Sequence, residues 1–512
     1  MKIKRQLIWL VSILSISLFM SFGVICLQIQ QHQAPVFLQA QSTIPQSNVI
    51  FTQDLENFAA AYTVADGKIF TLDVWGNLVC FDAKIGTRLW ENKIGVYGSV
   101  GPIIVRNEIA YVGSPDYDIG GVVKTVDINT GELLPHQFHA RDTSLAHKRG
   151  PDTFTVVNDR VFVKQSSWRA YNAISGKLLW ETSAPSVDLP GPPDLENVWA
   201  FEDNLVIATG YFYTDYNTRH EKSTYRLNPD KGTVMWSILG FSDKQPLIYK
   251  NTIIFQDYKE NYADIGQTMM TVEASSGKTL WSINLNEDIY QPIIYKDQLL
   301  FVTSNGYIQA LDLPDGRLAW KTPVALPPES NISPIEIDTQ IQRIFWGYTK
   351  GWYNESTDNF QYMGNIYNLD LSNGELVWTA PFSNNSTHGS LSKIALLNKT
   401  VYASTGSALW ALNKTTGMEL GVKPFDHYVR PITSTDNKLF VVADLYVMAY
   451  TDFDSTNTDP PTNPPQSTNE PPTNPPQSTN LWTYAIPIFV ISLVIVILML
   501  LLYNRKKHHN LH

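Results

Sequence analysis

The 512-residue sequence has little charge and almost no cysteine. Charged residues make up 17% of it, against about 25% in an average soluble protein. Cys26 and Cys80 are the only cysteines, and Cys26 lies in an apolar run, which excludes a disulfide framework and a multi-cysteine zinc site. A glycine-rich phosphate loop after a strand, an HExxH zinc motif and a GxSxG nucleophile motif are also missing. The enzyme classes that depend on these motifs are therefore excluded.

Acidic residues are missing from both ends of the chain. Residues 1–40 and 481–512 contain six basic residues and no Asp or Glu, although the formal net charge of the whole chain is -10. The acidic excess therefore lies in the middle, which makes this part a poor partner for nucleic acid. With 44% hydrophobic and 12% aromatic residues, the chain is too apolar for general disorder, and its length indicates several domains or a repeat array.

Two long apolar runs are present, one near each end. Leu7–Leu27 follows basic residues and is long enough to cross a bilayer, so residues 1–30 are interpreted as a signal peptide or an uncleaved N-terminal membrane anchor, with a slight preference for the anchor. Residues 481–503 are entered by Trp482 and Tyr484 and followed by Arg505, Lys506 and Lys507. This pattern predicts a transmembrane helix followed by a basic cytoplasmic tail, 504–512, and it places the acidic middle outside the cytoplasm.

Proline is concentrated just before the second apolar run. Residues 460–480 repeat PPTNPPQSTN with a period of eleven, and proline at this density keeps a chain extended. Residues 454–480 are therefore expected to form a stalk between the membrane and the folded head. With an uncleaved N-terminal anchor, the protein would have two spans, both termini in the cytoplasm and the head extracytoplasmic; with a cleaved signal it would have one span.

A short motif recurs eight times in the middle of the chain, at intervals of 39 to 58 residues. Each copy has Asp, Asn or Glu four residues before a glycine, and six copies carry Trp four residues after it. The glycines are Gly86, Gly131, Gly176, Gly232, Gly277, Gly316, Gly374 and Gly417. The residues four before them are Asp82, Asp127, Asn172, Asn228, Glu273, Asp312, Asp370 and Asn413. The tryptophans are Trp90, Trp180, Trp236, Trp281, Trp320 and Trp378.

The motif is suited to a tight turn between two strands. Glycine supplies the positive φ of the turn, the Asp or Asn side chain accepts hydrogen bonds from the turn's own amides, and Trp fills the space between neighbouring sheets. Two further apolar runs accompany each copy, so one unit is expected to form four antiparallel strands, A to D, with the motif between C and D. Such units predict an all-β chain, a β-propeller of four-stranded antiparallel blades over residues 55–453, after a linker at 31–54.

The number of blades is less directly encoded. Eight motifs predict eight blades, which is our primary expectation. Nine stays open as the alternative, because Tyr428–Thr435, Lys438–Ala443 and Leu445–Thr451 resemble strands A, B and C of a further unit, and Asn48–Phe51 could supply its D strand.

The repeats resemble the pyrroloquinoline-quinone-like (PQQ-like) repeat family, and Asp127–Gly131 and Thr415–Gly417 match its pattern best. The resemblance covers about residues 55–451 and implies the propeller fold. Catalytic relatives use PQQ, calcium, a pair of adjacent cysteines and an Asp base. Because adjacent cysteines are missing here, we expect no cofactor and no catalytic residue, and we interpret Cys80 as a small buried hydrophobic residue. Relatives without quinone chemistry act as assembly scaffolds, which is the class that the resemblance implies.

Histidines cluster after the second motif. His136, His139 and His147 lie with Arg141, Asp142 and Asp152 in one long connection. Three imidazoles can bind a transition metal, but this spacing in a loop defines no coordination geometry. We therefore expect a hydrated loop and no metal site.

The candidate binding residues lie in the long connections between strands B and C, which share one face of a propeller. These connections are 113–121, 211–222, 256–267 and 347–363, and they are rich in Tyr and Asp. The candidates are Asp116, Tyr117, Tyr211, Tyr213, Tyr216, Tyr258, Tyr262, Tyr348, Trp352 and Tyr353. Aromatic rings on long loops of a rigid scaffold are typical of binding surfaces. The alternative is that these tyrosines only cap the rim of the ring.

The sequence thus indicates a non-catalytic, membrane-anchored propeller that binds a protein or a surface glycan. A quinoprotein-type oxidoreductase that uses PQQ and calcium, and a structural cell-surface protein, are the alternatives. Asn-x-Ser/Thr triplets at Asn331, Asn354, Asn384, Asn385, Asn398 and Asn413 are compatible with a glycoprotein.

Overall fold

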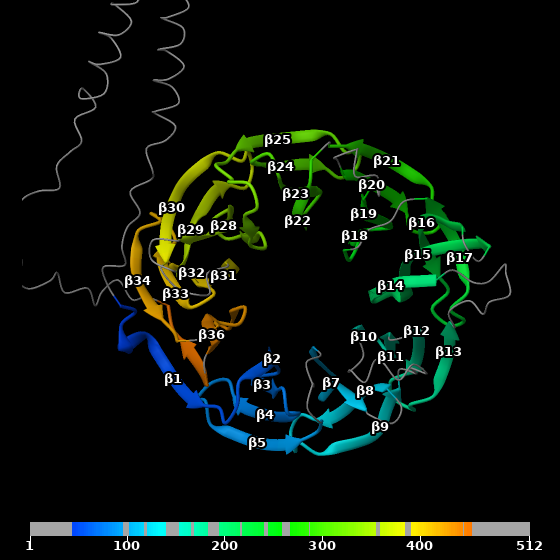
Figure 1. Ribbon diagram of the computed structural model, residues 1–512, viewed down its shortest axis with the longest axis horizontal. Helices are drawn as coiled ribbons and strands as arrows, with labels where there is room; N and C mark the ends of the chain where they lie inside the picture. The colour runs from blue at the N-terminus through cyan, green and yellow to red at the C-terminus, as the bar shows by residue number, and fades with distance from the viewer. Residues whose placement is uncertain are drawn as a thin grey trace, which may run out of the picture. The chain divides into compact units, whose positions relative to one another are not determined.

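Nine antiparallel sheets follow one another around a common axis in the computed structural model (Figure 1). The structure describes residues 43–452 except 96–101, 117–119, 140–152, 165–167, 183–193, 216–217, 240–243, 259–266, 286, 355–358, 385–390, 427 and 444. The chain divides into two compact units, Met1–Phe453 and Asp454–His512, and every described residue belongs to the first. The predicted signal or anchor, stalk, transmembrane helix and tail lie outside the described residues. Within these residues, no helix has the length and apolar character needed to cross a membrane.

The first three blades follow the expected order A to D, from the axis outward. Blade 1 contains β2 (Ala59–Ala65), β3 (Lys68–Asp73), β4 (Asn77–Asp82) and β5 (Arg88–Lys93). Blade 2 contains β6 (Ile103–Arg106), β7 (Ile109–Asp116), β8 (Gly120–Asp127) and β9 (Leu133–His139). Blade 3 contains β10 (Thr153–Val157), β11 (Arg160–Lys164), β12 (Trp168–Asn172) and β13 (Leu178–Thr182).

The next three blades repeat this arrangement. Blade 4 contains β14 (Asp194–Phe201), β15 (Leu205–Asp215), β16 (Thr218–Leu227) and β17 (Val234–Leu239), with the short 3-10 helix η2 (Glu202–Asn204) between its first two strands. Blade 5 contains β18 (Leu247–Tyr249), β19 (Thr252–Tyr258), β20 (Gln267–Glu273) and β21 (Thr279–Asn284). Blade 6 contains β22 (Ile289–Tyr295), β23 (Gln298–Thr303), β24 (Tyr307–Asp312) and β25 (Leu318–Pro323).

The last three blades include two variations. Blade 7 has a divided inner strand, β26 (Asn331–Ile332) and β27 (Glu336–Asp338), followed by β28 (Arg343–Asn354), β29 (Asn359–Asp370) and β30 (Leu376–Asn384). Blade 8 contains β31 (Leu391–Leu396), β32 (Thr400–Thr405), β33 (Ala408–Asn413) and β34 (Glu419–Pro424). Blade 9 contains β35 (Thr433–Thr435), β36 (Lys438–Ala443), β37 (Tyr446–Tyr450) and, as its outer strand, β1 (Val49–Asp54), which follows the 3-10 helix η1 (Gln46–Asn48).

The ninth blade corrects the expectation of eight and confirms the alternative. Its outer strand comes from the start of the propeller, because β1 pairs antiparallel with β37 from Val49–Tyr450 to Asp54–Tyr446. Blade 9 therefore needs no turn from C to D, and it carries no ninth copy of the motif. The strand lies inside residues 31–54, which we expected to be a linker, so the propeller begins earlier than predicted.

The hydrophobic core is divided into nine clusters, and each cluster is shared by two neighbouring blades. Cys80, for example, is fully buried between blades 1 and 2 with Phe70 and Val112. This burial confirms the interpretation of Cys80 as a small buried hydrophobic residue, and it raises the pKa of the thiol to about 12. Because each blade packs only against its neighbours, the ring gains stability from adjacent contacts, as repeat proteins do.

The eight motif turns have a common geometry. The φ angles of the eight motif glycines lie between +68° and +80°, and each glycine amide donates to the carbonyl oxygen of the residue four positions before it, at 2.7–2.9 Å. In the turn of blade 8, Asn413 Oδ1 also accepts from the amides of Thr415 and Thr416, both at 3.0 Å. Asp82, Asp127, Asn172 and Asn228 each accept from two amides of their turns in the same way, which confirms the predicted role of the side chain in these turns.

Each motif tryptophan reaches the glycine turn of the following blade. A Cβ added to Gly277 would lie 2.8 Å from the ring of Trp236 in the preceding blade, and the Trp236 indole donates to Ala274 O at 3.0 Å. The prediction that tryptophan packs between sheets is confirmed. In addition, the structure shows that tryptophan and glycine of adjacent repeats are fitted to each other.

Candidate functional site

The β28–β29 hairpin of blade 7 carries three of the predicted binding residues. Twelve residue pairs run from Arg343–Asp370 to Asn354–Asn359, whereas the corresponding hairpin of blade 6 has six. At the end of the hairpin farthest from its connection, Arg343 forms an ion pair with Asp370 at 2.6 Å. The hairpin therefore extends well beyond the length that a blade of this ring needs.

Tyr348 lies in the packed half of this hairpin. Its side chain is buried in the core between blades 6 and 7, where its ring centroid is 6.3 Å from that of Tyr367. Tyr367 also stacks on Trp346 at 4.8 Å and donates a hydrogen bond to Ala325 O. Burial raises the pKa of Tyr348. Tyr348 therefore stabilises the interface between two blades and is not part of the exposed surface.

Trp352 and Tyr353 lie in the outer half of the hairpin and are 39% and 49% exposed. Consecutive residues of a strand point to opposite faces of the sheet. Because both side chains are exposed, this end of the hairpin has two open faces. It thus presents two large aromatic side chains to the surroundings.

The exposed end is fixed by contacts at its base. Lys350 Nζ contacts Glu329 at 2.8 Å and donates to Pro328 O at 2.7 Å. The hydrogen bond from Lys350 and its charge lower the pKa of the Glu329 carboxyl. A Cβ on Gly351 would lie 2.6 Å from the ring of Tyr362, so glycine allows the tyrosine to lie against the strand. These contacts hold the part of β28 next to Trp352 against the segment between β25 and β26.

The other candidates lie on hairpins of blades 2, 4 and 5. Asp116 ends β7, Tyr211 and Tyr213 lie in β15, and Tyr258 ends β19. Tyr117, Tyr216 and Tyr262 lie outside the described residues. The connections from B to C share one face in every blade, so the fold brings these positions to the face of Trp352. Blades 4 and 5 are neighbours, while blade 7 is separated from blade 5 by one blade, so the candidates do not form one compact cluster.

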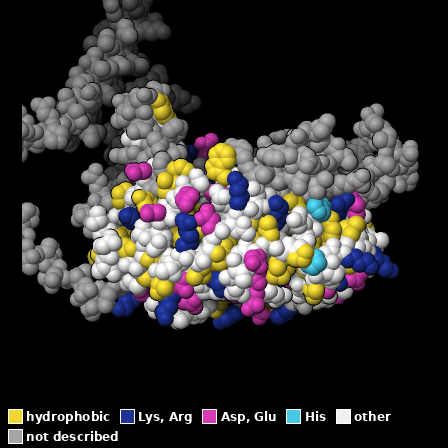
Figure 2. Space-filling view, turned by 90° about the horizontal axis from the view of Figure 1, so that it is seen from below, with side chains coloured by type: hydrophobic (Ala, Val, Ile, Leu, Met, Phe, Trp, Pro, Cys, Tyr) yellow, Lys and Arg dark blue, Asp and Glu magenta, His cyan; other side chains and the backbone are white. Residues whose placement is uncertain are grey.

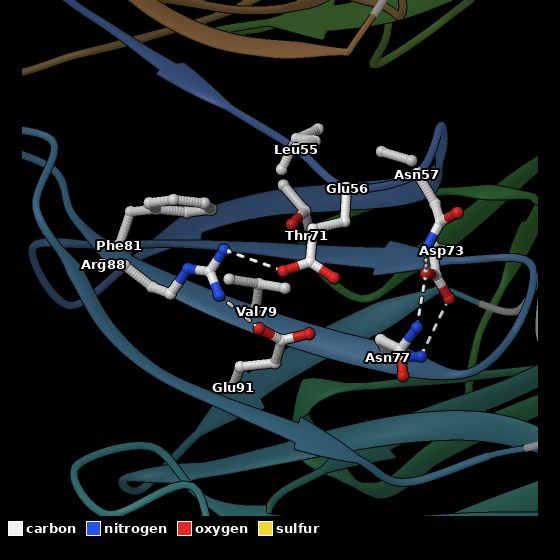
Figure 3. A pocket seen from close by; sticks show the side chains of 11 residues that line it. Leu55, Glu56, Asn57, Thr71, Asp73, Asn77, Val79, Phe81, Arg88 and Glu91 are labelled. Atoms are coloured by element: carbon white, nitrogen blue, oxygen red, sulfur yellow. Dashed lines mark hydrogen bonds and ion pairs between the residues drawn. The ribbon is translucent and has the colours of Figure 1, made fainter.

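A small cleft lies where the ring closes, between blade 1 and the connection from β1 to β2, residues 55–57 (Figure 3). Arg88 contacts Glu56 at 3.5 Å and also pairs with Glu91, while Asp73 accepts from Asn57 and Asn77 at 2.9 and 2.7 Å. Its volume of about 20 Å³ suffices for a water molecule but not for an organic ligand. These polar groups therefore stabilise the closure and do not form a ligand site.

The histidine cluster is only partly described. His136 and His139 lie in β9, and His147 is outside the described residues. The carbonyl oxygen of His139 accepts hydrogen bonds from Arg169 and Tyr171. Among the described residues, no three His, Cys, Asp or Glu side chains are grouped as metal ligands would be. The expectation that no metal is bound stays a prediction.

The residues present do not fit the quinone chemistry of catalytic relatives. That chemistry needs two adjacent cysteines on the cofactor, whereas Cys80 is buried between two blades and Cys26 is far from it in the sequence. That the protein binds neither PQQ nor calcium stays a prediction.

The packing roles of two residues were not predicted from the sequence. Phe51 of β1 occupies the place of a motif tryptophan, because a Cβ on Gly86 would lie 2.4 Å from its ring. His136, which follows the Pro135 that replaces tryptophan in the second motif, faces Gly176 in the same way. The sequence indicated this role only indirectly, because Phe51 lies in the segment that could supply the outer strand of a ninth blade.

The fold and its repeats define the class of this protein: it is a nine-bladed propeller of PQQ-like repeats. The family model PQQ_2, described as "Outer membrane protein assembly factor BamB", matches residues 45–188, 169–337 and 220–457. Together these ranges span most of the chain, and the chain belongs to this family.

The sequences of three curated proteins resemble parts of the chain. Outer membrane protein assembly factor BamB of Moranella endobia is 21% identical over 51% of this chain and 77% of its own length. The BamB of Legionella pneumophila is 28% identical over 30% of this chain and 34% of its length. The lanthanide-dependent methanol dehydrogenase of Methylacidiphilum fumariolicum is 30% identical over 22% of this chain and only 17% of the enzyme.

Solved structures resemble the chain more distantly. The computationally designed Ika8 protein has a TM-score of 0.45 and 12% identity, and the match covers 79% of this chain and all of that protein. BamB from Moraxella catarrhalis has a TM-score of 0.42 and 12% identity, with 79% of this chain and 99% of that chain covered.

Proposed function

We propose that this protein is a non-catalytic binding or scaffold module that holds a partner protein or a surface glycan on the face of its long hairpins. The observation that carries the proposal is the projecting end of the β28–β29 hairpin, where Trp352 and Tyr353 are exposed on opposite faces. Large aromatic rings on a rigid support supply contact area at low entropic cost. The length of the hairpin also exceeds what packing between blades requires.

The relatives favour binding over catalysis. Two of the similar proteins are named as assembly factors, which supports a scaffold role that depends on protein contacts. The similarity to the methanol dehydrogenase covers a small part of that enzyme, and the adjacent cysteines of quinone catalysis are missing from this sequence. We accordingly propose that the protein binds neither PQQ nor calcium.

The proposed location follows from the ends of the sequence. The apolar run at 481–503 would anchor the protein, the proline-rich segment would carry the propeller away from the membrane, and the propeller would lie outside the cytoplasm. In this location Asn331 and Asn398, which are exposed, would be accessible for glycosylation. Partners would then be other surface or secreted proteins, or glycans.

The proposal is tested with the full-length chain, purified in mild detergent because of its two apolar runs. Binding to an array of linear polysaccharides and 15-residue peptides is compared between the wild type, the double variant Trp352→Ala/Tyr353→Ala and the control Trp75→Ala. Trp75 is a matched control because it is also 49% exposed, but it lies on the short β3–β4 turn of the same face.

We expect the wild type and the Trp75→Ala variant to bind the same probes, and the double variant to lose them. Equal binding by all three proteins would contradict the role of the hairpin. Stoichiometric uptake of PQQ with calcium, followed by dye-linked oxidation of an alcohol, would replace the proposal with an oxidoreductase.

A further inference from the structure

The nine outer strands differ in how their free edges are protected. An exposed strand edge offers unpaired N–H and C=O groups to other chains, and proteins commonly block such edges with charged residues or proline. Seven of the nine outer strands contain a charged residue or proline: β1, β5, β9, β13, β25, β30 and β34. The other two, β17 with the sequence VMWSIL and β21 with TLWSIN, contain neither.

These two strands belong to neighbouring blades, 4 and 5 (Figure 1). Each ends its sheet, so no strand of the described residues pairs with its outer edge. Val234, Met235 and Leu280 are 44%, 49% and 49% exposed, and Ser237 and Ser282 are exposed as well. The rim of blades 4 and 5 therefore combines a free edge with exposed, uncharged side chains.

The position after the motif tryptophan shows the difference most clearly. It holds Glu91, Glu181 and Lys321 in blades 1, 3 and 6, but the uncharged Ser237, Ser282 and Thr379 in blades 4, 5 and 7. In blade 7 the strand contains Pro381 instead of a charge. On the side of the ring where β5 and β9 lie, charged side chains are mixed with hydrophobic ones (Figure 2). The strands β9 and β30 also lack charged residues, but each contains a proline, so only β17 and β21 lack both charge and proline.

We infer that β17 and β21 bind an extended, uncharged segment of a partner protein by β-strand addition. The backbone of the segment would pair with the free edge, and its alternate side chains would contact Val234, Met235 or Leu280. A charged segment would lose hydration next to these apolar side chains without gaining an ion pair. The chemistry of the edge therefore selects a neutral strand of alternating apolar and small polar residues.

A second copy of this chain fits the edge less well. Two convex rims would meet over little more than one six-residue strand, which buries far less than the roughly 1,600 Å² of a standard stable interface. An extended segment can instead run along the edge strand and contact exposed side chains on both faces of the sheet. This surface lies on the rim and is distinct from the face that carries Trp352.

The test uses a fluorescein-labelled peptide, Thr-Val-Thr-Ile-Thr-Val, with a soluble Gly-Gly-Lys-Lys tail. Its binding to the full-length chain is measured by anisotropy for the wild type and for Ser237→Lys/Ser282→Lys. The change is compatible with folding because blade 6 has Lys321 at the same position. Thr379→Lys is the matched control, since Thr379 is exposed and also follows the motif tryptophan, in a strand that already contains Pro381.

A second peptide has two consecutive central amides N-methylated, which blocks both of its edges without changing the side chains. We expect the wild type and Thr379→Lys to bind the first peptide equally, the double variant to bind at least tenfold more weakly, and the methylated peptide not to bind. Thermal unfolding of each variant checks that the propeller is intact.

The inference is overturned if the wild type does not bind the peptide at up to about 1 mM, if the double lysine variant binds it unchanged, or if N-methylation has no effect. A concentration-dependent dimer that sediments as a monomer after Ser237→Lys/Ser282→Lys would assign the edge to a second copy instead. Because Trp352→Ala/Tyr353→Ala leaves the rim intact, peptide binding by that variant separates this inference from the proposed function.

Discussion

Trp378 of blade 7 packs against Gly417 of blade 8 so closely that a Cβ on this glycine would lie 2.6 Å from Cε3 of the indole ring. The same indole donates a hydrogen bond to Lys414 O at 3.0 Å, in the turn that Gly417 completes. Tryptophan and glycine of successive repeats therefore form one contact. Each repeat must therefore fit the next at this contact.

Replacing Gly417 by alanine should test both demands on this residue. Its φ of +73° disfavours any Cβ, and the Cβ would also overlap the Trp378 ring, so we expect a loss of about 2–4 kcal/mol in the free energy of unfolding. Gly67→Ala is the control, because Gly67 has a φ of +68° but no atom within 4 Å of its Cβ position. We expect about 1–2 kcal/mol there. If urea unfolding shows the same loss of unfolding free energy for Gly417→Ala and Gly67→Ala, the overlap with the Trp378 ring adds nothing to the backbone strain, which would contradict this prediction.

The indole hydrogen bond can be separated from ring packing by comparing two tryptophans. Trp378 Nε1 donates to Lys414 O, whereas Trp320 Nε1 is buried without a hydrogen-bond partner. Trp378→Phe should therefore destabilise the protein by about 1 kcal/mol more than Trp320→Phe, since it removes the shorter hydrogen bond to Lys414 O and leaves that carbonyl with the longer one, from Asn368 Nδ2 at 3.4 Å. The two variants are compared by urea unfolding. A larger loss for Trp320→Phe would contradict this account of the motif.

A buried ion pair between blades 7 and 8 should make stability depend on pH. Asp338 and Lys414 are 2.8 Å apart, and their side chains are 11% and 6% exposed. Burial alone would raise the pKa of Asp338, but hydrogen bonds from Lys414 and from the amides of Ile341 and Gln340 outweigh it, so the pKa of the carboxyl is lowered.

Because the pKa of Asp338 is lower in the folded state, its contribution to stability is complete above the unfolded pKa of about 3.9. The contribution is lost as the pH falls through the lower folded value. We expect Asp338→Asn to cost about 3–5 kcal/mol near pH 7, since it leaves Lys414 charged and buried, and the difference from wild type to shrink below about pH 4. Asp315→Asn, at an exposed pair with Arg317, should change little at any pH. A cost for Asp338→Asn that is the same at pH 7 and pH 2.5 would contradict this linkage.

Ring closure depends on Phe51 of β1. Its side chain is 8% exposed and fills the place that tryptophan takes in six other blades. Phe51→Ala should cost about 3–5 kcal/mol, while Phe51→Trp should stay within about 1.5 kcal/mol of wild type because an equivalent site holds that ring elsewhere. Unfolding curves of both variants measure this. If Phe51→Ala lowers the free energy of unfolding by less than about 1 kcal/mol, the packing of β1 contributes little to ring closure.

The repeats made most of this fold predictable. The spacing of Gly86 to Gly417 identified the eight turns and the propeller, because a short turn is specified by local residues. The ninth blade was harder to predict because it has no turn of its own: Phe51 and Tyr450 are 399 residues apart in the sequence and lie in strands that pair only in the closed ring.

The candidate surface was predictable only in outline. Tyr348 and Trp352 lie on the same face of β28 and look equivalent in the sequence, but one is 7% and the other 39% exposed. The difference depends on where the neighbouring blade ends beside the hairpin, and the residues of the hairpin do not encode that. The unprotected edges of β17 and β21 likewise became visible only when the nine outer strands were compared.

Equilibrium binding to the probe that the array selects tests the central claim most directly. The dissociation constant is measured by calorimetry for the full-length wild type, Trp352→Ala/Tyr353→Ala and Trp75→Ala. If the hairpin end of blade 7 is the binding site, the double variant binds at least tenfold more weakly and Trp75→Ala stays within twofold of wild type. A double variant that binds as tightly as wild type would contradict the claim.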